Sequence, residues 1–306
     1  MNNPPKLSSP DARDETFDKL NVVVEAHPPA AHTTDANASP LSVATAIALW
    51  LMSFALVFVM QSVVLVLYTI ISQGVIGKNQ ILAAASSPAG IVVQVLANLP
   101  AYLLTLALIW WVTTAGGRHS FWQAISWKRH SALAWWVVAG VFLWAASIVL
   151  TYYVTKVFGS KETAFEQLIE SSQGARLAIV AIAVLGAPLV EEIVYRGVVY
   201  PALERAFGVA QAVVGVAALF ALVHVPQYWN NPGLITGLAL LSIALTIVRA
   251  RTGSVLPCFI IHLVFNSISA GLLLHESTSS QMPPGAPPTI DAAASFIFWI
   301  VSTARL

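Results

Sequence analysis

From residue 43 onward the sequence consists of long apolar runs, and this feature limits the possible folds more than any other. Each run approaches the ~20 residues that a helix needs to cross the hydrocarbon of a bilayer. A crossing segment must be a helix or part of a closed barrel, and runs of this length favour helices. We place eight spans at about 43–72, 90–113, 132–156, 176–198, 207–225, 233–250, 255–274 and 290–303.

The composition supports an all-α, polytopic membrane protein. Apolar residues make up 57% of the chain and charged residues 9%, whereas soluble domains carry about a quarter charged residues. The net charge of +1 provides no basic field, which argues against nucleic acid as a partner. Because Cys258 is the single cysteine of the sequence, an intramolecular disulfide and a site of paired Cys ligands are excluded.

Residues 1–40 differ from the rest, being rich in Pro, Ala, Asp and Ser. Such a segment buries too little apolar surface to offset its ordering entropy, so we expect a disordered cytoplasmic tail before a membrane domain of residues 41–306. With eight spans, Lys and Arg divide eleven against four between the two sides, which predicts that both termini are cytoplasmic. The compact connections are typical of a multi-pass protein of the bacterial inner membrane.

Ionisable side chains interrupt three of these spans. A charge at the bilayer centre costs about 2.5–3.5 kcal/mol on insertion scales, so such residues usually face the protein interior and mark a working site. The segments are VEEIVYRG (190–197), FALVHVPQ (220–227) and IIHLVFNS (260–267). The polar residues that they contribute are Glu191, Glu192, Arg196, His224, His262 and Asn266.

Helical spacing separates the two adjacent glutamates. Glu192 and Arg196 are four residues apart, so they share a face and can neutralise each other. Glu191 is rotated by about 100° from Glu192 and is freer to act as an acid or base. Pro188 should kink this span and leave a carbonyl without its helical N–H partner. We expect Pro226 to end the fifth span just beyond His224.

Together these side chains can hydrolyse an amide without a covalent intermediate. A buried carboxylate beside a histidine can hold a water molecule and remove its proton. His262 and Asn266 are also four residues apart, and an imidazole and an amide on one face can donate hydrogen bonds to a developing oxyanion.

The three segments resemble the motifs of the CPBP family of intramembrane proteases, which comprises CAAX proteases and bacteriocin-processing enzymes and is also called the Abi family. EEIVYRG resembles the EExxxR motif, FALVH the FxxxH motif and HLVFN the HxxxN motif, and the resemblance extends over about 176–275. One departure is Ala221, where glycine is common in the family. The resemblance implies eight membrane helices around a membrane-embedded catalytic cavity, and a glutamate-dependent endopeptidase.

The resemblance also implies a role for each residue. Glu191 is expected to be the general base, with His224 holding the catalytic water beside it. His262 and Asn266 are expected to form the oxyanion hole, and Glu192 and Arg196 to support the site. We expect no cofactor and no metal. The expected partners are the lipid bilayer and hydrophobic or lipidated peptides and proteins, among them prenylated CAAX proteins.

The residues alone leave other functions open. Two histidines and a glutamate could ligate zinc, as in a membrane metalloprotease, although the HExxH motif is absent. The polar cluster could also be structural, in a non-enzymatic scaffold or immunity protein, or could relay protons in a transporter. Ser254 follows Gly253 at the edge of a span, which indicates a turn rather than a nucleophile.

Overall fold

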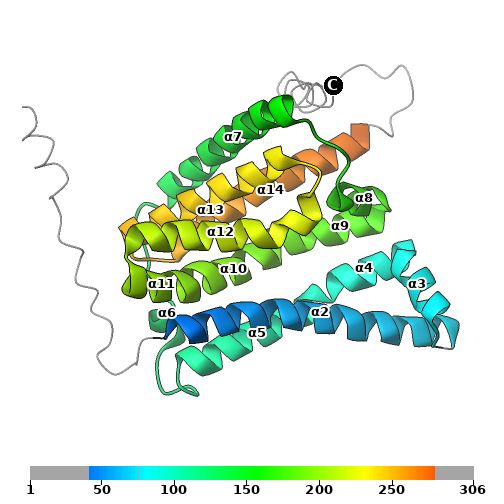
Figure 1. Cartoon of the computed structure of the whole chain (residues 1–306), viewed down its shortest axis with the longest axis horizontal. Coiled ribbons are helices and arrows are strands. Elements are labelled where there is room, and N and C mark those ends of the chain that lie inside the picture. The colour runs from blue at the N-terminus through cyan, green and yellow to red at the C-terminus, as the bar shows by residue number, and fades with distance from the viewer. Residues whose placement is uncertain (1–40, 75, 280–306) are drawn as a thin grey trace, which may run out of the picture. The chain divides into compact units, whose positions relative to one another are not determined.

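A computed structural model describes residues 41–74 and 76–279 of the chain (Figure 1). All regular secondary structure in these residues is helical, which confirms the predicted all-α class. The expected tail of residues 1–40 and the expected eighth span at 290–303 lie outside the described residues.

Seven helical stretches of the described residues are long and apolar enough to cross a membrane, and they match the first seven predicted spans. The second stretch is built from two consecutive helices and the fourth from five segments. Three short helices, α3 (Lys78–Ser86), α6 (Phe121–Ala124) and α8 (Ala164–Glu170), lie between the long stretches. The seven stretches are α2 (Val43–Gln73), α4 (Pro88–Leu96) with α5 (Asn98–Thr113), α7 (Leu133–Phe158), Gln173–Phe207, α12 (Val209–Tyr228), α13 (Pro232–Thr252) and α14 (Leu256–Ser279) as far as His275.

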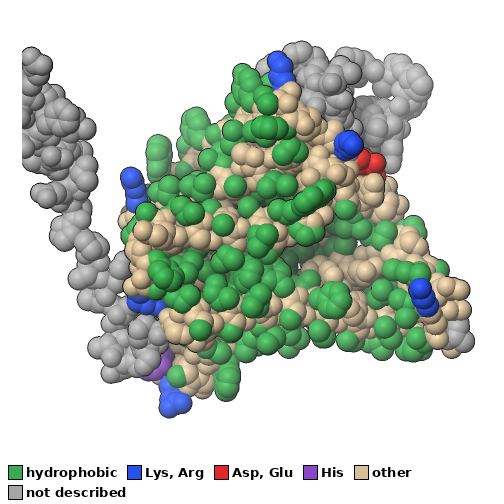
Figure 2. Space-filling model, viewed as in Figure 1, with side chains coloured by type: hydrophobic (Ala, Val, Ile, Leu, Met, Phe, Trp, Pro, Cys, Tyr) green, Lys and Arg blue, Asp and Glu red, His purple; other side chains and the backbone are tan. Residues whose placement is uncertain are grey.

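The outward surfaces of these helices are hydrophobic. Phe58 in α2 and Phe142 in α7 expose 73% and 72% of their surface, and many Leu, Val and Trp side chains are exposed in the same way. On the face shown in Figure 2, hydrophobic side chains cover the helices and charged side chains are few. Because an apolar surface of this extent marks contact with a membrane or a partner, and seven helices can cross a bilayer, the chain is a multi-pass integral membrane protein.

Two predicted boundaries are wrong. The fourth span was expected to end at residue 198, but its helix continues to Phe207 and ends where Gly208 adopts a φ of 85°. The polar residues Glu204 and Arg205 end the apolar run without breaking the helix, because hydropathy marks the edge of the hydrocarbon rather than the end of a helix. The fifth span does not stop at Pro226, which lies inside α12, two residues before its end at Tyr228.

The fourth stretch lies between two groups of helices (Figure 1). On one side it contacts α2 and α5, and on the other it contacts α12 and α14, which pack with α13 and α7. Its middle is therefore enclosed by protein on both sides, whereas the long helices around it face outward. Along the chain it consists of α9 (Gln173–Ala181), η1 (Ile182–Gly186), α10 (Ala187–Glu192), η2 (Ile193–Val199) and α11 (Tyr200–Phe207).

Candidate active site

The two glutamates lie at the end of α10, a short α-helical segment between two π-helical segments, η1 and η2. In a π-helix each carbonyl accepts a hydrogen bond from the N–H five residues later, and single π turns inside α-helices are frequent at functional sites. Each π segment here is followed by a proline, Pro188 after η1 and Pro201 after η2. The next hydrogen bond in each π-helical pattern would need an N–H from this proline, and proline has none.

At the first of these prolines, an asparagine side chain from another helix donates a hydrogen bond to the carbonyl that the proline leaves without a partner. The N–H of Ala187 bonds to the carbonyl of Ile182, five residues earlier. The next pair in this register would join Pro188 to Ala183, and Pro188 has no N–H to give. The Ala183 carbonyl instead accepts a hydrogen bond of 2.9 Å from Nδ2 of Asn266 in α14. The predicted loss of a helical hydrogen bond at Pro188 is thus compensated by one of the motif residues.

The second proline repeats this arrangement with a different side chain. The N–H of Tyr200 bonds to the carbonyl of Tyr195, five residues earlier. The next pair would join Pro201 to Arg196, and the Arg196 carbonyl accepts instead from Nε of Arg249 in α13, at 3.0 Å. Side chains from α14 and α13 therefore hold the backbone on both sides of the glutamates.

Glu192 and Arg196 form the expected ion pair, fully buried. Nη1 of Arg196 lies 2.9 Å from Oε1 of Glu192, and both side chains have 0% exposure. Nη2 of Arg196 donates to the hydroxyl and to the carbonyl of Ser242, at 2.9 Å and 3.0 Å. The charge of each partner is therefore neutralised inside the protein, and the pair links span four to α13.

His262 binds the same carboxylate. Its Nδ1 lies 2.8 Å from Oε1 of Glu192, and the ring is 2% exposed. An ionised carboxylate only accepts hydrogen bonds, so Nδ1 carries the proton of this bond. Nε2 of the same ring faces Oε2 of Glu191 at 3.8 Å. His262 thus stands between the two glutamates, oriented by Glu192.

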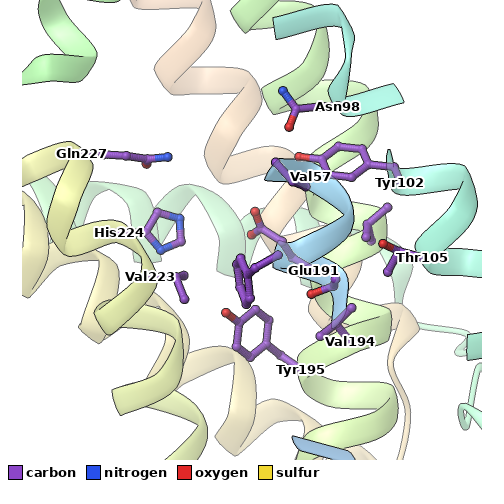
Figure 3. Close-up of a pocket in the computed structure, with 13 residues that line it drawn as sticks. Val57, Asn98, Tyr102, Thr105, Glu191, Val194, Tyr195, Val223, His224 and Gln227 are labelled. Carbon is purple, nitrogen blue, oxygen red and sulfur yellow. The ribbon is translucent and has the colours of Figure 1, made fainter. Parts of the chain in front are cut away.

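Glu191 faces a cavity instead. Its side chain is 25% exposed, and it lines a cavity of about 200 Å³ together with His224 from α12 (Figure 3). Nδ1 of His224 lies 2.7 Å from the carbonyl oxygen of Phe220, and since a carbonyl only accepts, Nδ1 is the donor. In the neutral ring Nε2 then keeps a lone pair, which can accept a hydrogen bond from water.

The cavity contains polar residues that the sequence analysis did not identify. Asn98, Tyr102 and Thr105 line it from α5, and Gln227 lines it from α12 (Figure 3). The three residues of α5 are spaced i, i+4 and i+7, so they lie on one face of an otherwise apolar span. That spacing is the signal that could have located this wall. The remaining lining residues are Ser53, Phe54, Val57, Val190, Val194, Tyr195 and Val223.

The six predicted site residues are therefore divided among three environments. Glu191 and His224 lie together on the cavity wall. Glu192, Arg196 and His262 are buried behind it in one hydrogen-bonded cluster. Asn266 is bonded to the backbone of span four, and neither it nor His262 is among the residues that line the cavity.

Ser254 and Cys258, two potential nucleophiles, are buried and bonded to backbone groups. Ser254 is buried, and its hydroxyl exchanges hydrogen bonds with the backbone of Lys128 at 3.0 Å and 3.2 Å, in the turn that the sequence predicts. Cys258 is buried between α13 and α14, with Sγ 3.2 Å from the carbonyl of Leu245. Within residues 41–74 and 76–279, no group of three or more His, Cys, Asp or Glu side chains is placed to hold a metal ion.

One family model matches the part of the chain that contains these residues. Residues 173–268 match the family described as type II CAAX prenyl endopeptidase Rce1-like, and this range contains all six predicted residues. The comparisons with curated proteins and with solved structures gave no match. The match coincides with the region in which the sequence resembles the CPBP proteases and thereby confirms that resemblance. Residues 173–268 are thus an Rce1-like domain, of a family of type II CAAX prenyl endopeptidases.

Proposed function

We propose that the protein is an intramembrane glutamic endopeptidase. It hydrolyses peptide bonds of membrane-associated or prenylated, CAAX-type proteins or peptides with a water molecule activated by Glu191 and His224. The observation that carries this proposal is the division between the two glutamates. Glu192 is neutralised by Arg196 in the protein interior, whereas Glu191 lies on a cavity wall with an imidazole beside it. A carboxylate within a membrane span that has no Lys or Arg partner is costly and is expected to have a function.

The proposed reaction begins with a water molecule between Glu191 and Nε2 of His224. Glu191 takes a proton from the water as its oxygen attacks the carbonyl carbon of the scissile bond. The carbonyl oxygen becomes an oxyanion and accepts hydrogen bonds from the protein. Glu191 then gives the proton to the leaving nitrogen, the C–N bond breaks, and the products are a carboxylic acid and an amine. No covalent intermediate with the enzyme forms.

The buried cluster supports this chemistry by position. Glu192 orients His262, and His262 places Nε2 3.8 Å from the Glu191 carboxylate. In the proposal, Asn266 also supplies a hydrogen bond to the oxyanion, through the amide hydrogen that the Ala183 carbonyl does not use, whereas His262, whose ring proton is bonded to Glu192, acts by position.

The substrate class is supported by the lining of the cavity. Apart from its polar residues, the wall consists of Phe54, Val57, Val190, Val194 and Val223. An apolar segment or a prenylated terminus is compatible with such a wall and with arrival from the bilayer. Proteins and peptides of the CAAX type are the substrates that the family name implies.

The test offers the purified protein, in lipid nanodiscs, a prenylated CAAX peptide, the same peptide without prenyl group, and a hydrophobic peptide of unrelated sequence. We expect cleavage of a membrane-bound peptide, identified by the masses of the two products, at the same rate with and without a chelator. Cleavage that stops on chelation and returns with zinc would identify a metalloprotease. Failure to cleave any peptide, together with normal cell physiology in the Glu191→Gln strain, would identify a scaffold.

A further inference from the structure

We propose that Tyr102 of α5 is a further catalytic residue, which donates a hydrogen bond from its hydroxyl to the carbonyl oxygen of the peptide bond under attack. The inference rests on the proposed function, because it assigns a donor within the same reaction. Tyr102 lies outside residues 173–268 and thus outside the range that matches the family. The case for it begins with the hydrogen bonds that the motif residues already make.

The residues expected to form the oxyanion hole are largely committed to other partners. His262 gives its Nδ1 proton to Glu192, so Nε2 of the neutral ring has a lone pair and no hydrogen to donate. Asn266 gives one amide hydrogen to the Ala183 carbonyl and lies off the cavity lining. Beside the single amide hydrogen that Asn266 has left, an oxyanion in the cavity therefore needs a further donor, on the wall itself.

Tyr102 is placed to be this donor. It reaches the cavity from α5, on the wall opposite His224, with Glu191 between them (Figure 3). It lines the same cavity as Glu191, and no hydrogen bond joins its hydroxyl to another described residue. When water between Glu191 and His224 attacks the carbonyl carbon, a substrate whose carbonyl oxygen points toward the α5 wall brings this oxygen to Tyr102.

The ring of Tyr102 is held firmly, as preorganised stabilisation requires. It packs against two hydrophobic clusters of the core, one around Phe220 and one around Ile179 and Ile182. It also lies on the backbone of Gly186, at the end of η1: a Cβ there would be 3.2 Å and 3.3 Å from Cε2 and Cδ2 of the ring. The missing side chain at Gly186 thus leaves the space that the tyrosine ring occupies beside the catalytic segment.

Other polar groups on the wall fit this role less well. Gln227 is exposed at the end of α12 and has no contact that fixes its amide. Asn98 donates through Nδ2 to the Val95 carbonyl at 2.8 Å. The hydroxyl of Thr105 is buried and so is not accessible to an oxyanion in the cavity. The carboxylate of Glu191 points away from Tyr195 (Figure 3).

The test compares Tyr102→Phe with the parent enzyme in the peptide assay. This change removes one hydroxyl and keeps the ring. Loss of an oxyanion donor lowers kcat by about 10²–10³-fold, and because the bond is made in the transition state, KM should change by less than about twofold. Tyr153→Phe is the matched control: Tyr153 lies exposed on α7, away from the cavity lining, and its loss should leave kcat unchanged.

A second variant moves the ring without touching the hydroxyl. In Gly186→Ala the new Cβ forces the Tyr102 ring to shift by a few tenths of an ångström, and we expect kcat to fall several-fold. Gly186 has a φ of −102°, so alanine is compatible with its backbone. Added to Tyr102→Phe, Gly186→Ala should cause little further loss, because the hydroxyl that it displaces is already absent.

Three results would overturn the inference while leaving the proposed function intact. These are a kcat of Tyr102→Phe within threefold of the parent, a rise in KM alone, or full additivity with Gly186→Ala, each with Glu191→Gln inactive. If Tyr102→Phe lowers the melting temperature, the test rests on Gly186→Ala instead. A kcat of Gly186→Ala equal to that of the parent would then overturn the inference. Cleavage by Glu191→Gln at the parental rate would instead remove the proposed function itself.

Discussion

Glu191 and Glu192 are neighbours in sequence with opposite surroundings. Glu192 shares one oxygen between Arg196 and His262 inside the protein, while Glu191 reaches a cavity that His224 also lines, and Nε2 of His262 lies 3.8 Å from it. A helix turns by about 100° per residue, and this rotation alone sends the two side chains to different sides of span four.

This difference predicts that the two carboxylates respond differently to the same change. Glu192→Gln leaves the guanidinium of Arg196 buried without its counter-ion, and breaking a buried pair in this way costs about 3–5 kcal/mol. We expect a clear fall in the melting temperature of Glu192→Gln in detergent. Replacing both partners, as Glu192→Met with Arg196→Met, should recover much of the stability. A Glu192→Gln protein as stable as the parent would contradict the structural role of the pair.

At this scale the sequence predicted the ion pair, because both partners lie on one helix at a known spacing. It did not predict that His262 bonds to Glu192, since that contact joins residues 70 positions apart. Tyr102 and Thr105 were missed because a tyrosine and a threonine in an apolar span carry no charge to mark them. The catalytic roles of Glu191, His224, His262 and Asn266 remain predictions.

Among the helices, span four has the least regular geometry. Its two π segments place prolines where the register demands an N–H, and Asn266 and Arg249 each bond to the carbonyl so released. Both side chains come from neighbouring helices, so the irregular backbone depends on tertiary contacts. In hydrocarbon an unsatisfied carbonyl is costly, and this makes such compensation necessary.

The second of these bonds can be tested with a substitution cycle. Arg249→Met keeps the length of the side chain and leaves the Arg196 carbonyl without its donor, at a cost of about 1–3 kcal/mol. Adding Pro201→Ala restores a backbone N–H at the position that this carbonyl lacks, so the two changes together should cost less than their sum. The control is Arg251→Met, exposed in the same turn of α13. Strict additivity in melting experiments would contradict the coupling.

The long helices were predictable because hydrocarbon imposes a length and an apolar composition on each of them. The π segments were not, since a shift of one residue in the hydrogen-bond register leaves no trace in hydropathy. Pro226 was misjudged because a proline removes one hydrogen bond, to the carbonyl four residues earlier, without ending the helix, and α12 continues through it to Tyr228.

On the scale of the whole molecule, the proposed active site lies where span four is enclosed by α2 and α5 on one side and by α12 and α14 on the other. The matched range supplies span four, α12 and most of α14, whereas the α2 and α5 wall comes from the N-terminal part of the chain. The N-terminal helices thus complete the cavity.

The membrane orientation remains a prediction of the sequence. Two of the cations counted toward the cytoplasmic side, Arg196 and Arg249, are buried in the protein and so do not belong in a comparison of loops. Without them the excess of Lys and Arg keeps its sign, and cytoplasmic termini are still expected.

The central claim is that Glu191 activates water in this membrane cavity, and one measurement tests it most directly. The rate of peptide cleavage by Glu191→Gln is compared with the parent and with Glu170→Gln, an exposed glutamate on α8. We predict that Glu191→Gln loses about 10²–10⁴-fold in kcat with an unchanged melting temperature, while Glu170→Gln cleaves like the parent. A folded Glu191→Gln protein that cleaves at the parental rate would contradict the account.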